Sequence, residues 1–120
     1  MNVLDPSHNS FIEQVLPMLL ERKMGVQAMK TLAAGTIIRE DGQAPAPLIP
    51  KHLTLEEALH FVWSLPVSVL VSGVDSVSQM RQNVRLARRF SKISKDERAQ
   101  LVDKVAQFAG RQYESYKQRD

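Results

Sequence analysis

Hydrophobic side chains recur at helical spacing in four stretches of the chain, and each stretch opens on a residue that can cap a helix. Ser10, Thr54, Ser76 and Ser94 are each followed three residues later by glutamate or glutamine, which is the form of a capping box. The apolar positions behind each cap fall on one helical face, which predicts four main helices. The residues expected to face inward are Ile12, Val15, Leu16, Leu19 and Leu20, then Ala58, Leu59 and Val62, then Val77, Met80, Val84 and Ala87, and finally Leu101, Val105 and Phe108.

Prolines and glycines set the expected limits of these helices. The first helix should run to about Lys23, and Pro17 should either kink it or mark the start of its regular part near Leu16. Pro66 should stop the second helix. Residues 36–53 show no apolar period and hold several prolines, so we expect a long loop, either a lid or a mobile connection. The last helix should continue into a polar tail, residues 111–120.

Short β-branched or apolar runs between the helices predict strands. Val67–Val71 is typical of a buried strand, whereas Val26–Met29 is compatible with a strand or a helix and is assigned as a strand here. Asn2–Leu4 can add a third strand at the start. Strands that alternate with helices favour a parallel sheet with right-handed crossovers. Three strands cannot close a barrel, which needs about eight, so the sheet should have two open edges.

Composition narrows the class of protein. With 120 residues, of which 43% are hydrophobic and 24% charged, the chain has the makeup of one globular domain spanning residues 1–120. It has no cysteine, which excludes disulfides, thiolate metal sites and a cysteine nucleophile. The longest apolar stretch, Leu65–Val74, is about half the length that a bilayer requires, and the first residues lack signal-peptide features. We therefore expect a cytoplasmic protein without a membrane partner. His8, His52 and His60 show no metal-ligand spacing, so no metal site is predicted.

Two positions at the expected strand ends could bind an anion. After the strand that ends near Ser72, Gly73 leads into the capped helix, and the free amides of a helix start attract anions. Arg81, one turn further, could reach a phosphate bound there. Lys30 follows the other strand and could hold a phosphate or a ribose oxygen. Each feature also has a plain structural interpretation, namely an ordinary β-α turn and a lysine at the rim of a sheet.

Basic residues are concentrated in and after the third helix. Because Phe90 is the only aromatic residue near them, a solvated helix face is favoured over a nucleic-acid surface. The residues are Arg81, Arg85, Arg88, Arg89, Lys92, Lys95 and Arg98.

Three segments together resemble the C-terminal portion of the aldo/keto reductase family. They are residues 2–11, residues 25–30, and residues 69–83 with the sequence Gln79-Met80-Arg81-Gln82-Asn83. The resemblance implies an α/β fold, a partial TIM (β/α)8 barrel of about three parallel strands with flanking helices plus a C-terminal helix. It also implies NADP(H), weakly bound or vestigial, as the cofactor. The residues implied to bind it are Lys30, Thr31, Gly73, Asp75, Ser76, Gln79, Arg81, Gln82 and Asn83.

The resemblance leaves out the catalytic residues of that family. Its catalytic aspartate, tyrosine, lysine and histidine belong to earlier strands of the barrel, so no catalytic residue is assigned here. Tyr113 and Tyr116 are expected in the terminal helix, away from a lysine partner at the nicotinamide end. The predicted function is therefore a truncated reductase-like protein that does not reduce carbonyls alone. The alternative is a non-catalytic subunit or interaction module that pairs through its open edge with a copy of itself or with the missing half of the barrel.

Overall fold

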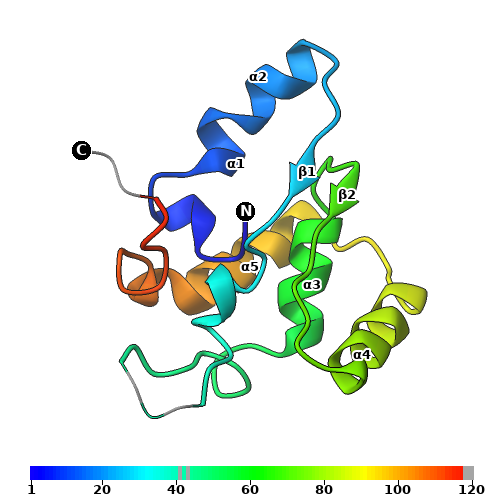
Figure 1. Cartoon of the computed structure of the whole chain (residues 1–120). Helices are drawn as coiled ribbons and strands as arrows, with labels where there is room; N and C mark the ends of the chain where they lie inside the picture. The colour runs from blue at the N-terminus through cyan, green and yellow to red at the C-terminus, as the bar shows by residue number, and fades with distance from the viewer. Residues whose placement is uncertain (41, 43, 118–120) are drawn as a thin grey trace.

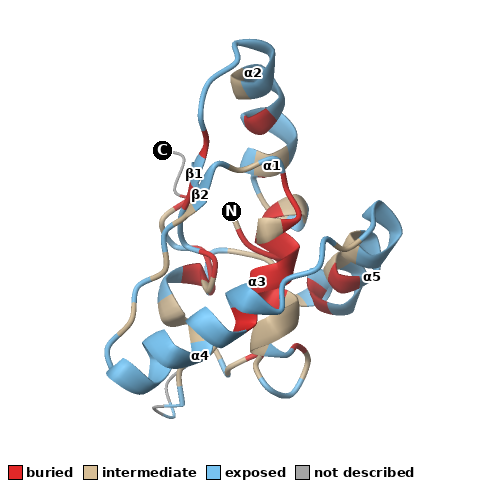
Figure 2. Ribbon diagram, turned by 90° about the vertical axis from the view of Figure 1, so that its right-hand side faces the viewer, coloured by how far each residue is buried: buried red, intermediate tan, exposed pale blue. Residues whose placement is uncertain are grey.

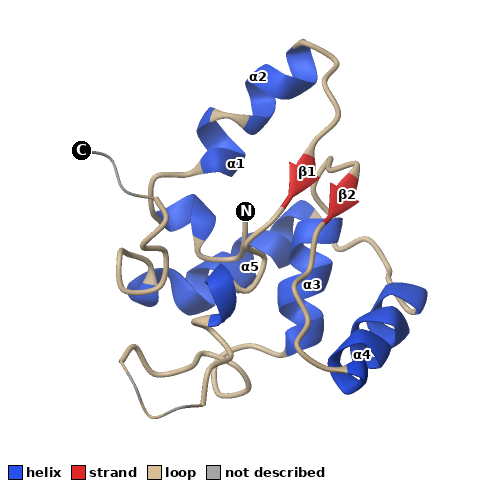
Figure 3. Cartoon of the chain, in the orientation of Figure 1, coloured by secondary structure: helices blue, strands red, loops and turns tan. Residues whose placement is uncertain are grey.

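The computed structural model describes residues 1–40, 42 and 44–117, and this part of the chain is mainly helical (Figure 1). The expected loop and polar tail extend over residues 41, 43 and 118–120, which lie outside the described residues. Figure 3 shows two short strands among the helices and loops. The elements are the 3-10 helix Asp5–Ser7, α1 Phe11–Gln14, α2 Leu16–Glu21, β1 Gln27–Ala28, the 3-10 helix Ala33–Gly35, α3 Leu55–Trp63, β2 Val69–Leu70, α4 Val77–Arg88, α5 Lys95–Val105 and the 3-10 helix Ala106–Phe108.

The sheet is much smaller than predicted, and the expectation of a partial TIM barrel is wrong. β1 and β2 pair in parallel, with Gln27 opposite Val69, but each strand has only two residues. The third expected strand, Asn2–Leu4, forms a turn instead, because the Asn2 side-chain oxygen accepts a hydrogen bond from the Leu4 amide at 2.7 Å. Such a local bond competes with the ladder of a strand. The described residues therefore form a helix-dominated fold with a small two-stranded sheet.

The first predicted helix is divided into α1 and α2, which project from the rest of the molecule in both Figure 1 and Figure 2. Pro17 lies in the first turn of α2, where its missing N–H has no intrahelical partner to lose. This confirms one of the two expected outcomes, a regular helix that begins at Leu16. The helix ends in a left-handed turn at Lys23 (φ 54°), and the Met24 amide donates to the Leu19 carbonyl at 2.9 Å.

The core is organised around α3, which Figure 2 shows as the most buried helix. Leu59, Phe61 and Val62 are at most 2% exposed. Thr54 caps this helix with a complete capping box, as the sequence predicts, and Ser94 does the same for α5. Leu101 and Val105 of α5 are buried in the same core, also as predicted. The described part of the long loop contributes to this core as well, through the buried residues Ile37, Leu48 and Leu53.

The orientation of α4 is opposite to the one predicted. Val77, Met80 and Val84, which were expected to be buried, are 69%, 48% and 41% exposed, and Ala87 is exposed too. Leu86 is the buried residue of this helix. Successive residues lie about 100° apart round a helix, so Leu86 shares a side with Gln79, Gln82 and Asn83 rather than with the apolar stripe. That mixed side faces the protein, and the stripe faces outward.

The C-terminal segment does not continue the last helix, and Tyr113 and Tyr116 lie in turns after residue 110. The segment folds back on the first residues of the chain and buries charged groups there. Lys117 Nζ lies 2.7 Å from Asp5 Oδ1 and 3.0 Å from Glu114 Oε1, and all three side chains are at most 1% exposed. Two carboxylates and one ammonium thus join the two ends of the described chain.

Candidate functional site

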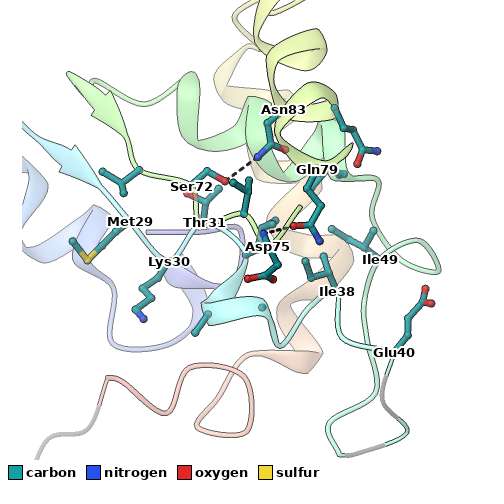
Figure 4. Close-up of a pocket in the computed structure, with 18 of the residues that line it drawn as sticks. Met29, Lys30, Thr31, Ile38, Glu40, Ile49, Ser72, Asp75, Gln79 and Asn83 are labelled. Atoms are coloured by element: carbon teal, nitrogen blue, oxygen red, sulfur yellow. Dashed lines mark hydrogen bonds between the residues drawn. The ribbon is translucent and has the colours of Figure 1, made fainter. Parts of the chain in front are cut away.

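A cavity of about 640 Å³ lies where β1 and β2 end and α4 begins (Figure 4). Its size falls within the usual range of small-molecule sites, about 300–1,000 Å³. Seven of the nine residues predicted to bind a nucleotide line it. They are Lys30, Thr31, Gly73, Asp75, Gln79, Gln82 and Asn83.

Parallel pairing explains why residues distant in sequence meet here. The carboxyl ends of parallel strands share one edge of a sheet, so the segments that follow β1 and β2 emerge side by side. Lys30 and Thr31 come from the first of these segments, and Gly73 and Asp75 from the second. Lys30 itself takes a left-handed conformation (φ 60°), which turns the chain sharply at the edge of the cavity. The short sheet is therefore sufficient to assemble the wall.

The amide side chains of α4 form a second wall, and two of the three, Asn83 and Gln79, are held by hydrogen bonds that are drawn in Figure 4. Asn83 Nδ2 donates to Ser72 Oγ at 3.1 Å, and Gln79 Oε1 accepts from the Asp75 amide at 2.7 Å. A side-chain amide has two donor hydrogens and an oxygen with two lone pairs, so one such bond leaves hydrogen-bonding capacity for a ligand. Both amides are thus oriented by the protein while they remain able to bind.

Ser76 and Arg81, the other two predicted residues, do not line the cavity. Ser76 is the N-cap of α4, and its hydroxyl accepts from the Gln79 amide at 3.2 Å. Arg81 is exposed, and helical geometry places it about 100–160° round α4 from each of the three amide residues. Val77 and Ser78, at the start of the helix, do not line the cavity either. The anion site expected at this helix start is therefore not part of the cavity.

The sequence reasoning missed the wall that the long loop supplies. Ile38, Glu40 and Ile49 line the cavity opposite the strand ends. Since residues 36–53 show no apolar period, nothing indicated which of their side chains would turn inward. The adjacent pair Ile37 and Ile38 was the available signal, because two isoleucines in a polar, proline-rich stretch are expected to contact a core.

Among the described residues of the wall, the ionisable groups are one lysine and two carboxylates, Lys30, Glu40 and Asp75. Lys30 Nζ also lies 5.7 Å from the centre of the Tyr116 ring, within the range of a cation–π contact. Thr31 is 3% exposed, and its hydroxyl has no hydrogen-bond partner among the described residues. An unsatisfied buried hydroxyl costs about 1–3 kcal/mol, so this part of the wall is not optimised for stability.

Tyr113 and Tyr116 are engaged in structural hydrogen bonds outside the cavity. Tyr113 Oη donates to the Ala46 carbonyl at 2.6 Å, and Tyr116 Oη donates to Glu114 Oε1 at 3.1 Å. Burial raises the pKa of the Tyr113 hydroxyl, and burial together with the Glu114 carboxylate raises the pKa of Tyr116. A raised pKa makes a tyrosine a weaker proton donor. Neither residue is suited to protonate a carbonyl oxygen.

Comparisons of the chain with models of protein families, with curated proteins and with solved structures found no match in any of the three. The resemblance to aldo/keto reductases therefore stays a prediction. Within the described ranges, no three histidine, aspartate or glutamate side chains gather in a way that could hold a metal ion. None of the helices in that part of the chain has the length and apolar character needed to cross a bilayer.

Proposed function

We propose that the cavity binds the adenosine part of a nucleotide cofactor such as NADP(H), weakly, and that the chain does not reduce carbonyls on its own. The observation that supports this most is the convergence of three amide side chains, a carboxylate and a lysine on one cavity formed by three separate segments. As part of the same proposal we retain the cytoplasmic location expected from the sequence.

The chemistry of the wall fits an adenosine ligand. Asparagine and glutamine amides pair with the hydrogen-bonding edge of adenine, which offers both a donor and an acceptor. Gln82 and Asn83 take this role, with Ile38 and Ile49 providing apolar surface for the base. A carboxylate accepts hydrogen bonds from ribose hydroxyls, which is the role of Asp75. A nicotinamide cofactor would supply a hydride when bound. The two tyrosines of this chain lie outside the cavity, so neither would donate the proton that carbonyl reduction also requires.

The test is a titration of the purified protein with NADPH, followed by the fluorescence of the cofactor. We expect weak saturable binding that Asn83→Ala lowers about five- to tenfold, since a lost hydrogen bond costs about 1–1.5 kcal/mol. Arg81→Ala is the matched control on the same helix and should leave the affinity unchanged. Absence of binding of both NADPH and AMP at about 1 mM, which corresponds to about −4 kcal/mol, would contradict the proposal if the protein is folded.

A second candidate function is the non-catalytic interaction module, and the open edges of the sheet favour it. Val69 in β2 is 50% exposed, and Val71, which follows this strand, is 48% exposed. Met29, which follows β1, is 53% exposed. An unpaired strand with exposed apolar side chains is a template for pairing with another chain. Sedimentation of the NADPH titration sample would show self-association, and Val69→Lys should reverse it. A monomer at all concentrations would leave the nucleotide site as the better supported function.

A further inference from the structure

We infer that the cavity prefers an adenosine with a free 2′-hydroxyl and binds one with a 2′-phosphate more weakly. The inference rests on the proposed function and narrows it. NADP(H) carries a phosphate at that position and NAD(H) does not, so the preferred ligand would be NAD(H) or AMP. Three features of the cavity support this, namely its charge, the place of Asp75 and the place of Arg81.

The charge of the wall is unsuited to a phosphate at the 2′ position of the ribose. Among the described residues that line the cavity, Lys30 is the cation, whereas Glu40 and Asp75 are carboxylates. One positive and two negative groups give a formal charge of −1 (1 − 2). A phosphate on the 5′ side of the ribose can pair with Lys30, but a phosphate at the 2′ position would lie close to the Asp75 carboxylate. Like charges at such distances repel unless a cation stands between them.

Asp75 lies next to Gln79, which belongs to the amide wall of α4. Its backbone amide is bound by Gln79 Oε1, and Figure 4 shows its carboxylate between Lys30 and Ile38, away from the Asn83 amide. A ribose joins its base on one side and its 5′-phosphate on the other. With adenine at the amides and the 5′-phosphate at Lys30, the ribose hydroxyls fall beside Asp75. A carboxylate there accepts from a 2′-hydroxyl, whereas an arginine is what accommodates a 2′-phosphate.

Arg81, the residue that could have supplied this arginine, lies on another side of α4. It does not line the cavity, and Gln79 and Asn83 are each about 160° from it round the helix axis. The direction of a side chain on a helix is set by its position in the sequence, and a change of rotamer cannot bring it round by that angle. The positive charge expected at the 2′ position is therefore absent from the described wall.

The experiment compares AMP with adenosine 2′,5′-bisphosphate by isothermal titration calorimetry on the folded 120-residue chain. The two ligands differ by the 2′-phosphate alone. We expect AMP to bind about tenfold more tightly, and Asp75→Asn to bring the two affinities close together, because the substitution removes the repelling charge. Asp103→Asn, the same change at an exposed position of α5, should leave the ratio as it is in the unmodified chain.

The outcomes separate the inference from the function on which it rests. If AMP binds and the bisphosphate binds as tightly or more tightly, the inference is wrong and the adenosine site stands. The inference is also wrong, and the adenosine site again stands, if Arg81→Ala weakens the binding of the bisphosphate but not that of AMP. The guanidinium would then reach the 2′-phosphate. If neither ligand binds to the folded protein, the proposed function itself fails.

Discussion

At the scale of single residues, the buried charges of Lys117, Asp5 and Glu114 are what the sequence could least reveal. Lys117 Nζ contacts both carboxylates and donates to the His8 carbonyl at 2.8 Å. Asn2 Nδ2 adds a hydrogen bond to Glu114 Oε1 at 2.8 Å. A lysine in a polar terminal stretch is normally solvated, and its burial depends on partners more than a hundred residues away.

Removal of the ammonium should therefore destabilise the protein strongly. Lys117→Met leaves two buried carboxylates without the ammonium that contacts them, and breaking a buried pair in this way costs about 3–5 kcal/mol. Lys104→Met is the control, because Lys104 pairs with Glu57 at 2.9 Å on the surface and such pairs contribute about 0–1 kcal/mol. The measurement is the free energy of unfolding in urea. Similar small losses in both variants would show that Lys117 is solvated in solution.

At the scale of elements, the starts of the helices were predictable and their orientation was not. Ser10, Thr54, Ser76 and Ser94 cap α1, α3, α4 and α5, because a cap depends on residues three positions apart. The direction in which α4 points its apolar stripe depends instead on what packs against it. The same rotation that exposes Met80 brings Gln82 and Asn83 into the cavity wall, so the wrong prediction of the buried face and the assembly of the site have one cause.

Paired truncations on α4 test this orientation. Leu86→Ala should lower the free energy of unfolding by about 2 kcal/mol or more, since Leu86 is 6% exposed and its loss leaves a cavity. Met80→Ala should change it by less than about 0.5 kcal/mol, because Met80 is 48% exposed. Chemical denaturation of both variants measures the difference. The reverse order would indicate that the apolar stripe is buried, as the hydrophobic pattern alone suggested.

At the scale of the whole molecule, the C-terminal segment holds the long loop that forms one wall of the cavity. Tyr113 Oη donates to the Ala46 carbonyl, and Thr36 Oγ1 donates to the Tyr113 carbonyl at 3.0 Å. Tyr113 is 4% exposed, so this contact is part of the core rather than a surface attachment. The end of the described chain thus fixes a loop whose Ile38 and Ile49 line the cavity.

Loss of this contact should loosen the loop before the rest of the fold. Tyr113→Phe leaves the Ala46 carbonyl without its donor, and a loss of about 1–2 kcal/mol raises the opened population about 5- to 30-fold. Limited trypsin digestion should then cleave after the exposed Lys51 faster by a similar factor. Tyr116→Phe is the matched control, because the Tyr116 hydroxyl bonds to Asn2 and Glu114 instead of the loop. Equal acceleration in both variants would contradict a specific role for Tyr113.

The sequence by itself determined what depends on neighbours along the chain. It predicted the helix caps, the start of a regular helix near Leu16 and the positions of the two short strands, and the resemblance that it carries named seven residues that share one cavity. The tertiary structure alone decided how far the strands extend, which side of α4 faces inward, that Arg81 lies outside the cavity, and that Lys117 is buried. Each of these depends on contacts between segments far apart in sequence, and the burial and packing that such contacts bring outweigh local preference.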